Sequence, residues 1–571
     1  MLASSFEPGT NLKGEAGGAH WSFVLDDLDV HRALVLGRPP EASLRSLARL
    51  CREVAVAPGR PGRKSAGHGD SSANVRIIDA VTPARLSLPD ASVDLLFFCD
   101  PSVLRRAAEQ PSDLENLRRI LRAGGTVYFE MPWWSPSLDH GARDRLESAF
   151  GPIQALNLTP GLGREAHTVV PTNDHETNLF FDRSDLQASV LPGRVGRKLD
   201  RWVRLVPGSG RVGRRSGYLC AGQGKARSGP PRYLVDLARK AGVSLEGFRW
   251  GLSAPGSYAS KKVLFFLFDR PGSPPCYVVK MTRSSNLNHR LENEHRALKL
   301  LEEKGIGVDG ELPRSRFFGH DGGLAVLGET VVHGKPFREM TAAHPQCPHV
   351  LRTIDWLTQL AVRTVDLSAA SCSDAAQDLA TLLKRYVEIY RPQDHHRRAL
   401  ERQLESLAAA NERFPAVFQH GDPGTWNILI DPSGRAGFLD WESADPRGMP
   451  LWDLLYFLRS FCVEAGRRTG NRDALAAFAD SFLLRSKLQS FVTSALAHYC
   501  SAISLPASLL EPIFYSCWMH RSLKEATRLK KGALPSGHYT RLLGLCLDHA
   551  RESESLLAGV ARVQSCPTDR R

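Results

Sequence analysis

The sequence predicts two folded regions of different class: an α/β region with a doubly wound parallel sheet in residues 1–222, and an α+β region in residues 233–571. A chain of 571 residues is too long for a single hydrophobic core. Strand-like and helix-like segments alternate in the first region, whereas in the second region a group of strands is followed by long amphipathic helices. Residues 223–232 are rich in glycine, proline and charge, and they are predicted to form the linker.

The composition is that of a globular protein, with 42% hydrophobic and 24% charged residues. No apolar run approaches the roughly twenty residues of a membrane span, and residues 1–15 lack the pattern of a secretory signal. The eleven cysteines are scattered singly, which predicts reduced thiols and a cytoplasmic location. The formal net charge of +13 bears on solubility and nonspecific association, so no specific nucleic-acid partner is predicted.

The elements of the first region follow from short apolar runs separated by turn residues and helical patterns. A helix is expected at residues 41–50, and another carries Leu114, Leu117, Ile120 and Leu121 toward a glycine turn. Strands are expected at residues 31–36, 53–57, 75–78, 95–99, 126–131, 178–181 and 218–221.

Two segments of this region resemble class I S-adenosylmethionine-dependent methyltransferases. They are L-P-D-A-S-V-D-L-L-F-F at residues 88–98 and L-R-R-I-L-R-A-G-G-T-V-Y-F-E at residues 117–130. The resemblance implies the doubly wound fold, but the cofactor motifs depart from the family pattern. Gly37-Arg38-Pro39-Pro40 replaces the glycine-rich turn, and Ala57-Pro58 replaces the acid expected after the second strand. We expect a retained fold without methyl-transfer chemistry or S-adenosylmethionine binding, and we interpret Asp79 as a turn residue.

Residues 193–215 form a basic stretch that contains Trp202. One interpretation is an amphipathic element that contacts an anionic surface or glycolipid, with Trp202 at the interface. The alternative is a solvated helix whose apolar side chains pack on the domain, and charge runs favour this second interpretation.

The second region contains H-G-D-P-G-T-W-N-I-L-I-D-P-S-G-R-A-G-F-L-D-W-E at residues 420–442. Asn427 follows Asp422 by five residues, and Asp440 follows Asp422 by eighteen. The pattern predicts a catalytic loop, a short strand, a turn and a second strand that ends in a carboxylate. Phosphoryl transfer requires one carboxylate for the attacking hydroxyl and an Asn and an Asp for Mg²⁺. The alternative is a surface hairpin made of ordinary turn residues.

These residues resemble the signature H-G-D-x-x-x-x-N-[IL]-L, followed by a D-W-E-like acid, of the aminoglycoside phosphotransferase and choline kinase-like family. The family's trailing G-x-P-x-x-D-L is also present, as Gly448, Pro450, Asp453 and Leu454. The resemblance implies a protein kinase-like fold with lobes at residues 233–332 and 333–571. It also implies ATP and Mg²⁺ as cofactors and a small-molecule hydroxyl as acceptor.

The nucleotide site implied by this resemblance draws on the first lobe. Gly256 and Ser257 suit a hairpin that covers the ATP phosphates. Lys280, on an expected strand at residues 276–281, would pair with Glu294 of an expected helix at residues 291–304, although Glu292 is an alternative. Backbone groups from Glu329 to Val331 would bind the adenine edge.

The roles assigned to the loop are hypotheses. Asp422 is expected to be the base or orienting carboxylate, Asn427 and Asp440 the metal ligands, and His420 a scaffold for the loop. Helices from residue 454 onward would form the cap that selects the acceptor, whose identity the sequence leaves open. Two other hypotheses about function stay open. The chain could be a non-catalytic nucleotide-binding scaffold, or a bifunctional protein with an active methyltransferase domain.

Overall fold

The computed structural model forms two compact units, which are described separately. The sheet unit contains Leu12–Leu291 and Ser315–Val331, and the helical unit contains Glu292–Arg314 and Val332–Arg571. The structure describes residues 20–58, 74–78, 82–131, 139–159, 167–184, 215–221, 229–254, 261–307, 309–340, 342, 344–529 and 531–565. The basic stretch at residues 193–214, most of the predicted linker, and Asp79 lie outside these residues.

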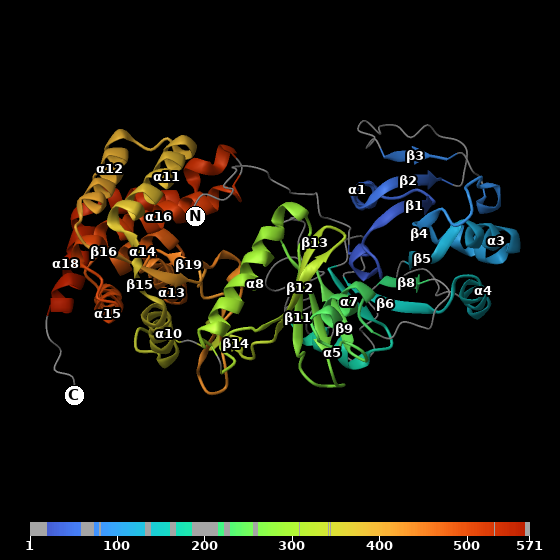
Figure 1. Ribbon diagram of the computed structural model, residues 1–571, viewed down its shortest axis with the longest axis horizontal. Helices are drawn as coiled ribbons and strands as arrows, with labels where there is room; N and C mark the ends of the chain where they lie inside the picture. Colours follow the sequence, from blue (N-terminus) through green and yellow to red (C-terminus); the bar gives the residue numbers. More distant parts are fainter. Residues whose placement is uncertain are drawn as a thin grey trace. The chain divides into compact units, whose positions relative to one another are not determined.

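One sheet of thirteen strands runs through the described part of the sheet unit (Figure 1). Five strands in the order β3-β2-β1-β4-β5 are parallel, and the order reverses direction between β1 and β4. This is the doubly wound arrangement that the sequence predicts. The strands are β1 (Val30–Leu36), β2 (Cys51–Ala57), β3 (Val75–Ile77), β4 (Val93–Phe98) and β5 (Leu121–Met131), which confirms the first five predicted strands.

The parallel strands are apolar on both faces because helices cover both faces. On β1, Ala33 and Val35 pack into one core, and Leu34 and Leu36 pack into a second core on the other face. The first core includes apolar residues of α1 and α7, and the second includes those of α2, α3 and α4. The helices are α1 (Glu41–Leu50), α2 (Pro101–Glu109), α3 (Pro111–Ile120), α4 (His140–Phe150) and α7 (Arg232–Lys240).

The strand predicted at residues 178–181 is wrong, because these residues lie within helix α5 (His175–Arg183). Asp174 caps this helix by accepting a hydrogen bond from the Thr177 N–H at 3.0 Å. An aspartate in this position favours a helix start over the strand that the Phe180-Phe181 pair indicated. The strand predicted at 218–221 is confirmed as β8 (Arg215–Ala221), and the prediction missed β6 (Ile153–Thr159) and β7 (Thr168–Pro171).

Strands on the two sides of the predicted linker pair with each other. Strand β7 pairs antiparallel with β9 (Arg249–Ser253), so the strands after residue 233 continue the same sheet in the order β9-β10-β11-β13-β12. These strands include the one predicted at residues 276–281. They are β10 (Val263–Phe268), β11 (Tyr277–Met281) and β13 (Leu324–Thr330), and β12 (Ser315–Asp321) lies at the edge. The domain limits predicted at residues 222 and 233 stay a prediction. The two compact units instead meet in the chain after Leu291, Arg314 and Val331.

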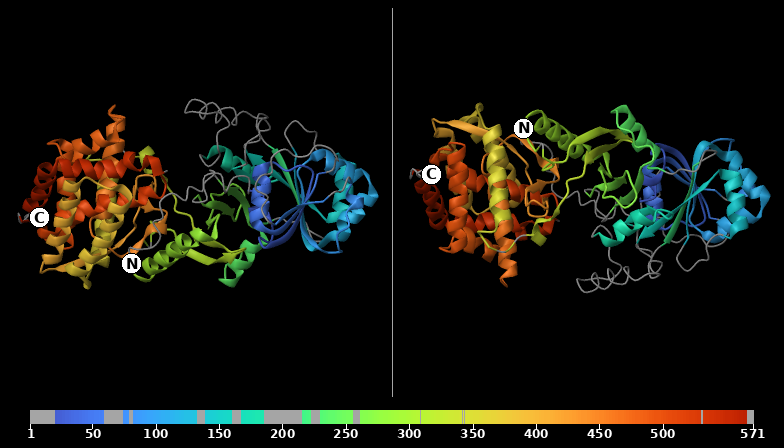
Figure 2. Two further views of the ribbon diagram at one scale, coloured as in Figure 1. Left: turned by 90° about the horizontal axis from the view of Figure 1, so that it is seen from above. Right: turned by 90° about the horizontal axis from the view of Figure 1, so that it is seen from below.

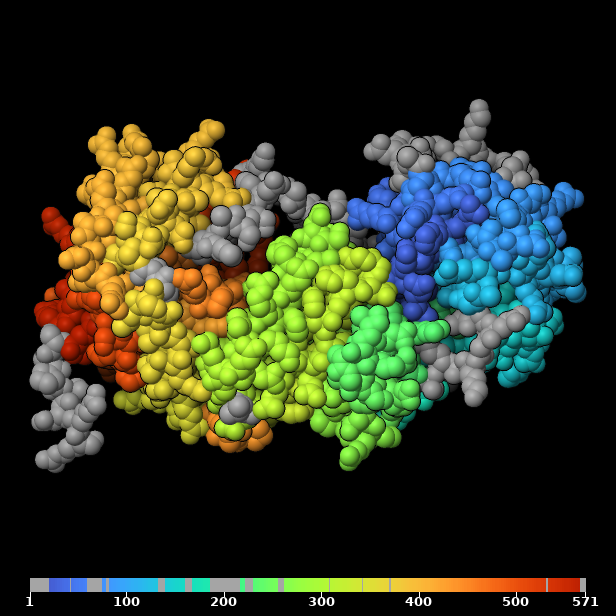
Figure 3. Space-filling view, in the orientation of Figure 1, coloured from blue at the N-terminus to red at the C-terminus, as the bar shows by residue number. Residues whose placement is uncertain are grey.

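Most of the helical unit is drawn in yellow to red in Figures 2 and 3. Its helices share one hydrophobic core. The long amphipathic helices predicted for the second region are present, and α10, α11 and α12 are among them. The helices are α8 (Asn288–Glu303, which begins in the sheet unit), α9 (Phe337–Met340), α10 (Pro348–Thr364), α11 (Cys372–Tyr390), α12 (Asp394–Ala409), α13 (Trp452–Arg468), α14 (Ala474–Phe482), α15 (Lys487–Ala502), α16 (Leu510–Ala526), α17 (His538–Asp548) and α18 (Ala550–Ser565).

Six short strands complete the helical unit. They are β14 (Lys335–Pro336), β15 (Asp366–Ser371), β16 (Arg413–Gln419), β17 (Ile428–Ile430), β18 (Ala436–Phe438) and β19 (Asp445–Gly448). All ten cysteines in the described residues of the chain are free, and eight of them are buried. Among the helices of the described residues, none combines the length and apolarity needed to cross a membrane.

Candidate active site

Strands β17 and β18 form the hairpin that the sequence predicts, and the hairpin brings two candidate residues together. Ile428 pairs with Phe438, so Asn427 stands just before one strand and Asp440 shortly after the other. The Leu439 N–H donates to the Asn427 carbonyl at 2.9 Å and extends the pairing by one step. The chain therefore folds back on itself between Asp422 and Asp440, which are eighteen positions apart.

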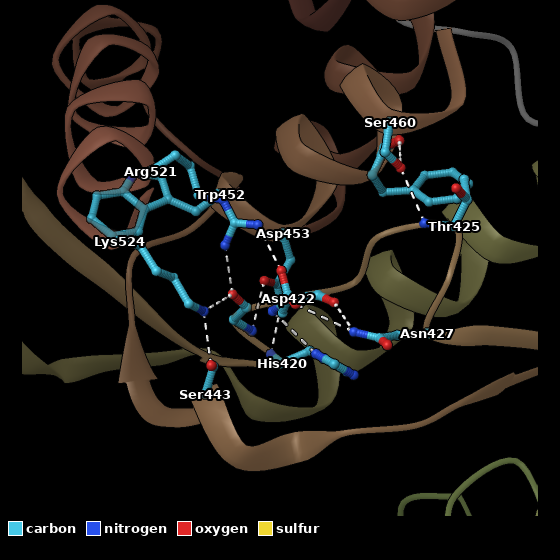
Figure 4. Close-up of polar contacts among 12 residues, drawn as sticks. His420, Asp422, Thr425, Asn427, Ser443, Trp452, Asp453, Ser460, Arg521 and Lys524 are labelled. Atoms are coloured by element: carbon cyan, nitrogen blue, oxygen red, sulfur yellow. Dashed lines mark hydrogen bonds and ion pairs between the residues drawn. The ribbon is translucent and has the colours of Figure 1, made fainter. Parts of the chain in front are cut away.

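Asp453 holds the start of the loop. Its two carboxylate oxygens accept the His420 N–H at 2.6 Å and the Gly421 N–H at 2.9 Å (Figure 4). Asp453 lies in the first turn of α13, so the helix fixes the position of the carboxylate. Burial raises the pKa of Asp453, and the His420 ring and the two N–H donors oppose that rise.

His420 is fully buried and bonds the loop to the hairpin. Its Nδ1 accepts the Asp422 N–H at 3.2 Å, so Nε2 carries the proton and donates to the Leu439 carbonyl at 2.9 Å. Burial lowers the pKa of His420, against the pull of three nearby carboxylates, and favours this neutral form. The geometry agrees with the scaffold role expected for this histidine.

Gly421 occupies a position that admits no side chain. Its φ is +78°, and a Cβ built there would lie 2.0 Å from the Ser443 carbonyl oxygen. We expect Gly421→Ala to lower the free energy of unfolding by about 2–5 kcal/mol, since backbone strain and a steric clash act together. The free energies of unfolding of the wild-type protein and of Gly421→Ala are measured by chemical denaturation.

Gly470→Ala is the matched control for this prediction. Gly470 has a φ of +98°, and a Cβ there would meet nothing within 4 Å, so it reports the backbone strain alone. We expect the control to lose only about 1–2 kcal/mol. Equal losses in the two variants would contradict the steric part of the explanation.

Asp422 lies against two cations of helix α16 (Figure 4). Arg521 donates from Nη2 to Asp422 Oδ1 at 2.7 Å and from Nη1 to the Gly421 carbonyl at 2.9 Å. Lys524 Nζ donates to the same carbonyl at 3.1 Å and to Ser443 Oγ at 2.7 Å. Burial would raise the pKa of Asp422, but the charges of Arg521 and Lys524 prevail and hold it at about 2. The carboxylate is therefore ionised at neutral pH.

Asn427 and Asp440 have the donor chemistry that Mg²⁺ requires. Asn427 Nδ2 donates to the Asp422 carbonyl at 2.9 Å and to Asp422 Oδ2 at 3.3 Å, which leaves its amide oxygen as the end that can coordinate a cation. Asp440 is held in the left-handed region at φ +68°, a strained conformation for a residue with a side chain. Amide and carboxylate oxygens are typical Mg²⁺ ligands, so the residues fit the metal.

Glu294 of α8 is fully buried and contacts the residue after Asp440. Its Oε1 accepts the Trp441 N–H at 3.0 Å, and the Trp441 ring packs 4.3 Å from the His420 ring. Helix α8 therefore supports the far end of the hairpin. Trp441 is fully buried and belongs to the core of the helical unit.

The other predicted nucleotide-site residues lie in the sheet unit. Lys280 and Glu329 are paired across β11 and β13, with Lys280 Nζ 2.6 Å from Glu329 Oε1. The Val331 N–H donates to the Cys276 carbonyl at 3.2 Å and so is engaged within the sheet. The predicted Lys280–Glu294 pair joins the two units and stays a prediction. Gly256 and Ser257 lie outside the described residues.

The sequence-based prediction missed Arg521 and Lys524, which lie about a hundred residues after Asp422. The one local signal is their spacing of three residues, which places both on one face of a helix. Most other residues of α16 are buried and apolar, and a basic pair in such a helix is unusual.

Residues 254–485 match the model of the phosphotransferase enzyme family, and they span less than half of the chain. No curated protein matches the sequence. Among solved structures, the aminoglycoside phosphotransferase APH(3'')-Id from Streptomyces rimosus, in complex with ADP and streptomycin, is 18% identical, with 46% of this chain and 90% of that chain covered and a TM-score of 0.29.

Two further structures cover different parts of the chain. An aminoglycoside phosphotransferase from Alicyclobacillus acidocaldarius is 17% identical over 53% of this chain and 91% of its own, with a TM-score of 0.32. A SAM-dependent methyltransferase from Aquifex aeolicus is 14% identical over 23% of this chain and 78% of its own, with a TM-score of 0.18.

Proposed function

We propose that the chain is an ATP- and Mg²⁺-dependent phosphotransferase that acts on a hydroxyl group of a small-molecule or sugar-type acceptor. The observation that carries the proposal is the set formed by Asp422, Asn427 and Asp440, which one loop and one hairpin hold together inside the region that matches the phosphotransferase family. The location proposed for the reaction is the cytoplasm, in keeping with the free thiols.

Each residue has a defined task in this reaction. The Asp422 carboxylate would orient the acceptor hydroxyl and take its proton as the hydroxyl oxygen bonds to the γ-phosphorus of ATP, while the bond from that phosphorus to the bridging oxygen breaks and ADP leaves. Asn427 and Asp440 would hold Mg²⁺, which when bound neutralises charge on the ATP phosphates. Asp453 and His420 keep the loop in one geometry, and that pre-organisation lowers the barrier.

The nucleotide would be held by residues of the sheet unit, with Lys280 on the phosphates and the backbone from Glu329 to Val331 at the adenine edge. Gly256 and Ser257 would cover the phosphates, and Glu294 would pair with Lys280. Lys280 Nζ lies 2.6 Å from Glu329 Oε1 within the sheet unit, so this lysine already has one acidic partner.

The experiment incubates the full chain with Mg-ATP and a metabolite extract and follows mass gains of one phosphoryl group by mass spectrometry. We expect at least one hydroxylated compound to gain the group, and the gain to disappear when Asp440→Asn replaces the wild-type protein or when the metal is chelated. Thermal stabilisation by Mg-ATP without transfer to any compound would instead favour a nucleotide-binding scaffold.

We also propose that the sheet unit does not bind S-adenosylmethionine where the strand order reverses. A Cβ built on Gly37 would lie 2.9 Å from Asp100 Cβ and 3.2 Å from Cys99 Sγ, so the turn after β1 packs closely on the end of β4. Pro39 and Pro40 remove two backbone donors from that turn. Calorimetric titration with S-adenosylmethionine is expected to show no binding, and a micromolar dissociation constant would support an active methyltransferase domain.

A further inference from the structure

Two buried arginines of the helical unit contact the same tyrosine ring. Arg459 of α13 is 8% exposed and Arg521 of α16 is 5% exposed. Their guanidinium carbons lie 5.0 Å and 5.8 Å from the centroid of the Tyr539 ring. Arg521 also bonds Asp422, so the shared tyrosine ring connects Arg459 to a cation that contacts the carboxylate proposed to receive the acceptor hydroxyl.

Arg459 has no carboxylate partner among the residues that the structure describes. Its Nε is buried without a hydrogen-bond partner, and its Nη2 contacts Nε2 of His538. Burial and the charges of Arg459 and Arg541 lower the pKa of His538 to about 4, so this histidine is neutral and leaves the arginine charge uncompensated.

Further charged groups of both signs lie around these two arginines. Arg467 and Arg541 also act on His538, opposed by Asp473. On α16, burial and Arg521 lower the pKa of Lys524 to about 8, and Asp422 and Glu442 oppose that shift. A buried cation without a counter-charge is costly, so an anion that enters this cluster would be bound favourably.

Cation–π contacts offset part of the cost of burying these guanidinium groups. The Arg521 guanidinium carbon lies 3.1 Å from the centroid of the Tyr456 ring, and such stacking offsets some loss of hydration. A ring, however, satisfies no N–H donor in the guanidinium plane, and the Arg459 Nε remains without an acceptor. The planar guanidinium group can donate two parallel hydrogen bonds to a carboxylate or a phosphate. An anion of either kind would supply the missing acceptor.

We propose that the acceptor carries an oxyanion, either a carboxylate or a phosphate, which binds Arg459 beside Arg521 and Lys524 while the acceptor hydroxyl faces Asp422. This inference rests on the proposed phosphotransferase function and names its substrate class. The same charges would repel an ammonium group, so the site disfavours a cationic acceptor.

The first test measures anion binding without ATP, so it does not depend on catalysis. Thermal unfolding of the full chain is followed at constant ionic strength with inorganic phosphate or acetate in place of chloride. We expect at least one of the two anions to raise the Tm of the wild-type protein. Arg459→Met should weaken this effect at least tenfold in anion concentration, and Arg459→Lys should restore part of it.

Arg472→Met is the matched control, because Arg472 is an exposed arginine of the same unit, before α14. It should respond to the anions as the wild type does. Absence of an anion effect in the wild type, or an equal effect in Arg459→Met, would overturn the inference. The comparison of phosphate with acetate tells which oxyanion the cluster prefers.

The second test identifies the charge of the compound that gains a phosphoryl group. We expect an acceptor with a carboxylate or phosphate, and we expect Arg459→Met to raise its KM at least tenfold with the KM for ATP unchanged. Transfer to a neutral or cationic acceptor would reject the inference and support the phosphotransferase. Anion binding without any transfer would support the cluster and count against the proposed function.

Discussion

Asp422→Asn is expected to lower the turnover number of the proposed transfer by about 10²-fold or more, with the KM for ATP little changed. The reason is that an amide has nearly the same shape as the carboxylate but cannot take the proton of the acceptor hydroxyl. Asparagine keeps an oxygen that can accept from Arg521, whereas alanine would leave this buried arginine with no side-chain acceptor at position 422. The isosteric change therefore isolates the chemical role.

The measurement is initial velocity against acceptor and ATP concentrations, together with thermal unfolding of each protein. Asp431→Asn is the matched control, because Asp431 also accepts from an arginine, Arg435 Nε at 3.0 Å, but lies in the turn of the β17–β18 hairpin. We expect the control to keep wild-type turnover. A folded Asp422→Asn protein with turnover within about threefold of the wild type would rule out the role assigned to this carboxylate.

The first five strands were predictable because each is a short apolar run bounded by turn residues, and local sequence determines both features. The error at residues 178–181 has a local cause as well, since the Asp174 cap outweighs the strand preference of two phenylalanines. The continuous sheet was not predictable. It depends on the pairing of β7 with β9, which joins segments about eighty residues apart through backbone groups that leave no mark in the sequence.

The candidate active site also combines features that local sequence determines with features that depend on long-range packing. Asp422, Asn427 and Asp440 are recognisable because the loop and hairpin that position them are contiguous in sequence. Arg521 reaches Asp422 only because α16 packs beside the loop, and no spacing rule connects these two positions. The sequence therefore identifies the candidate loop and hairpin, whereas the two cations beside Asp422 become visible only in the packed helices.

Asp453→Asn is expected to reduce both stability and turnover, although Asp453 is assigned no direct part in the transfer. Its two oxygens each accept one backbone N–H of the loop, and an asparagine would present an N–H₂ group to one of these donors. Loss of one buried hydrogen bond costs about 1–3 kcal/mol. The released loop would also displace Asp422, and a shift of about 1 Å at a reacting group can lower turnover by about 10²-fold.

Denaturant unfolding and turnover measured well below the Tm separate these two effects, since the folded fraction is then close to one in every variant. Asp374→Asn serves as the control, because Asp374 accepts the Ser371 N–H at 2.9 Å at the exposed start of α11. It should lose some stability and no turnover. If Asp453→Asn behaves like this control, the two hydrogen bonds from the His420 and Gly421 N–H groups to Asp453 stabilise the fold and have no effect on turnover. If its turnover falls while the folded fraction is unchanged, α13 positions the catalytic loop through a single carboxylate.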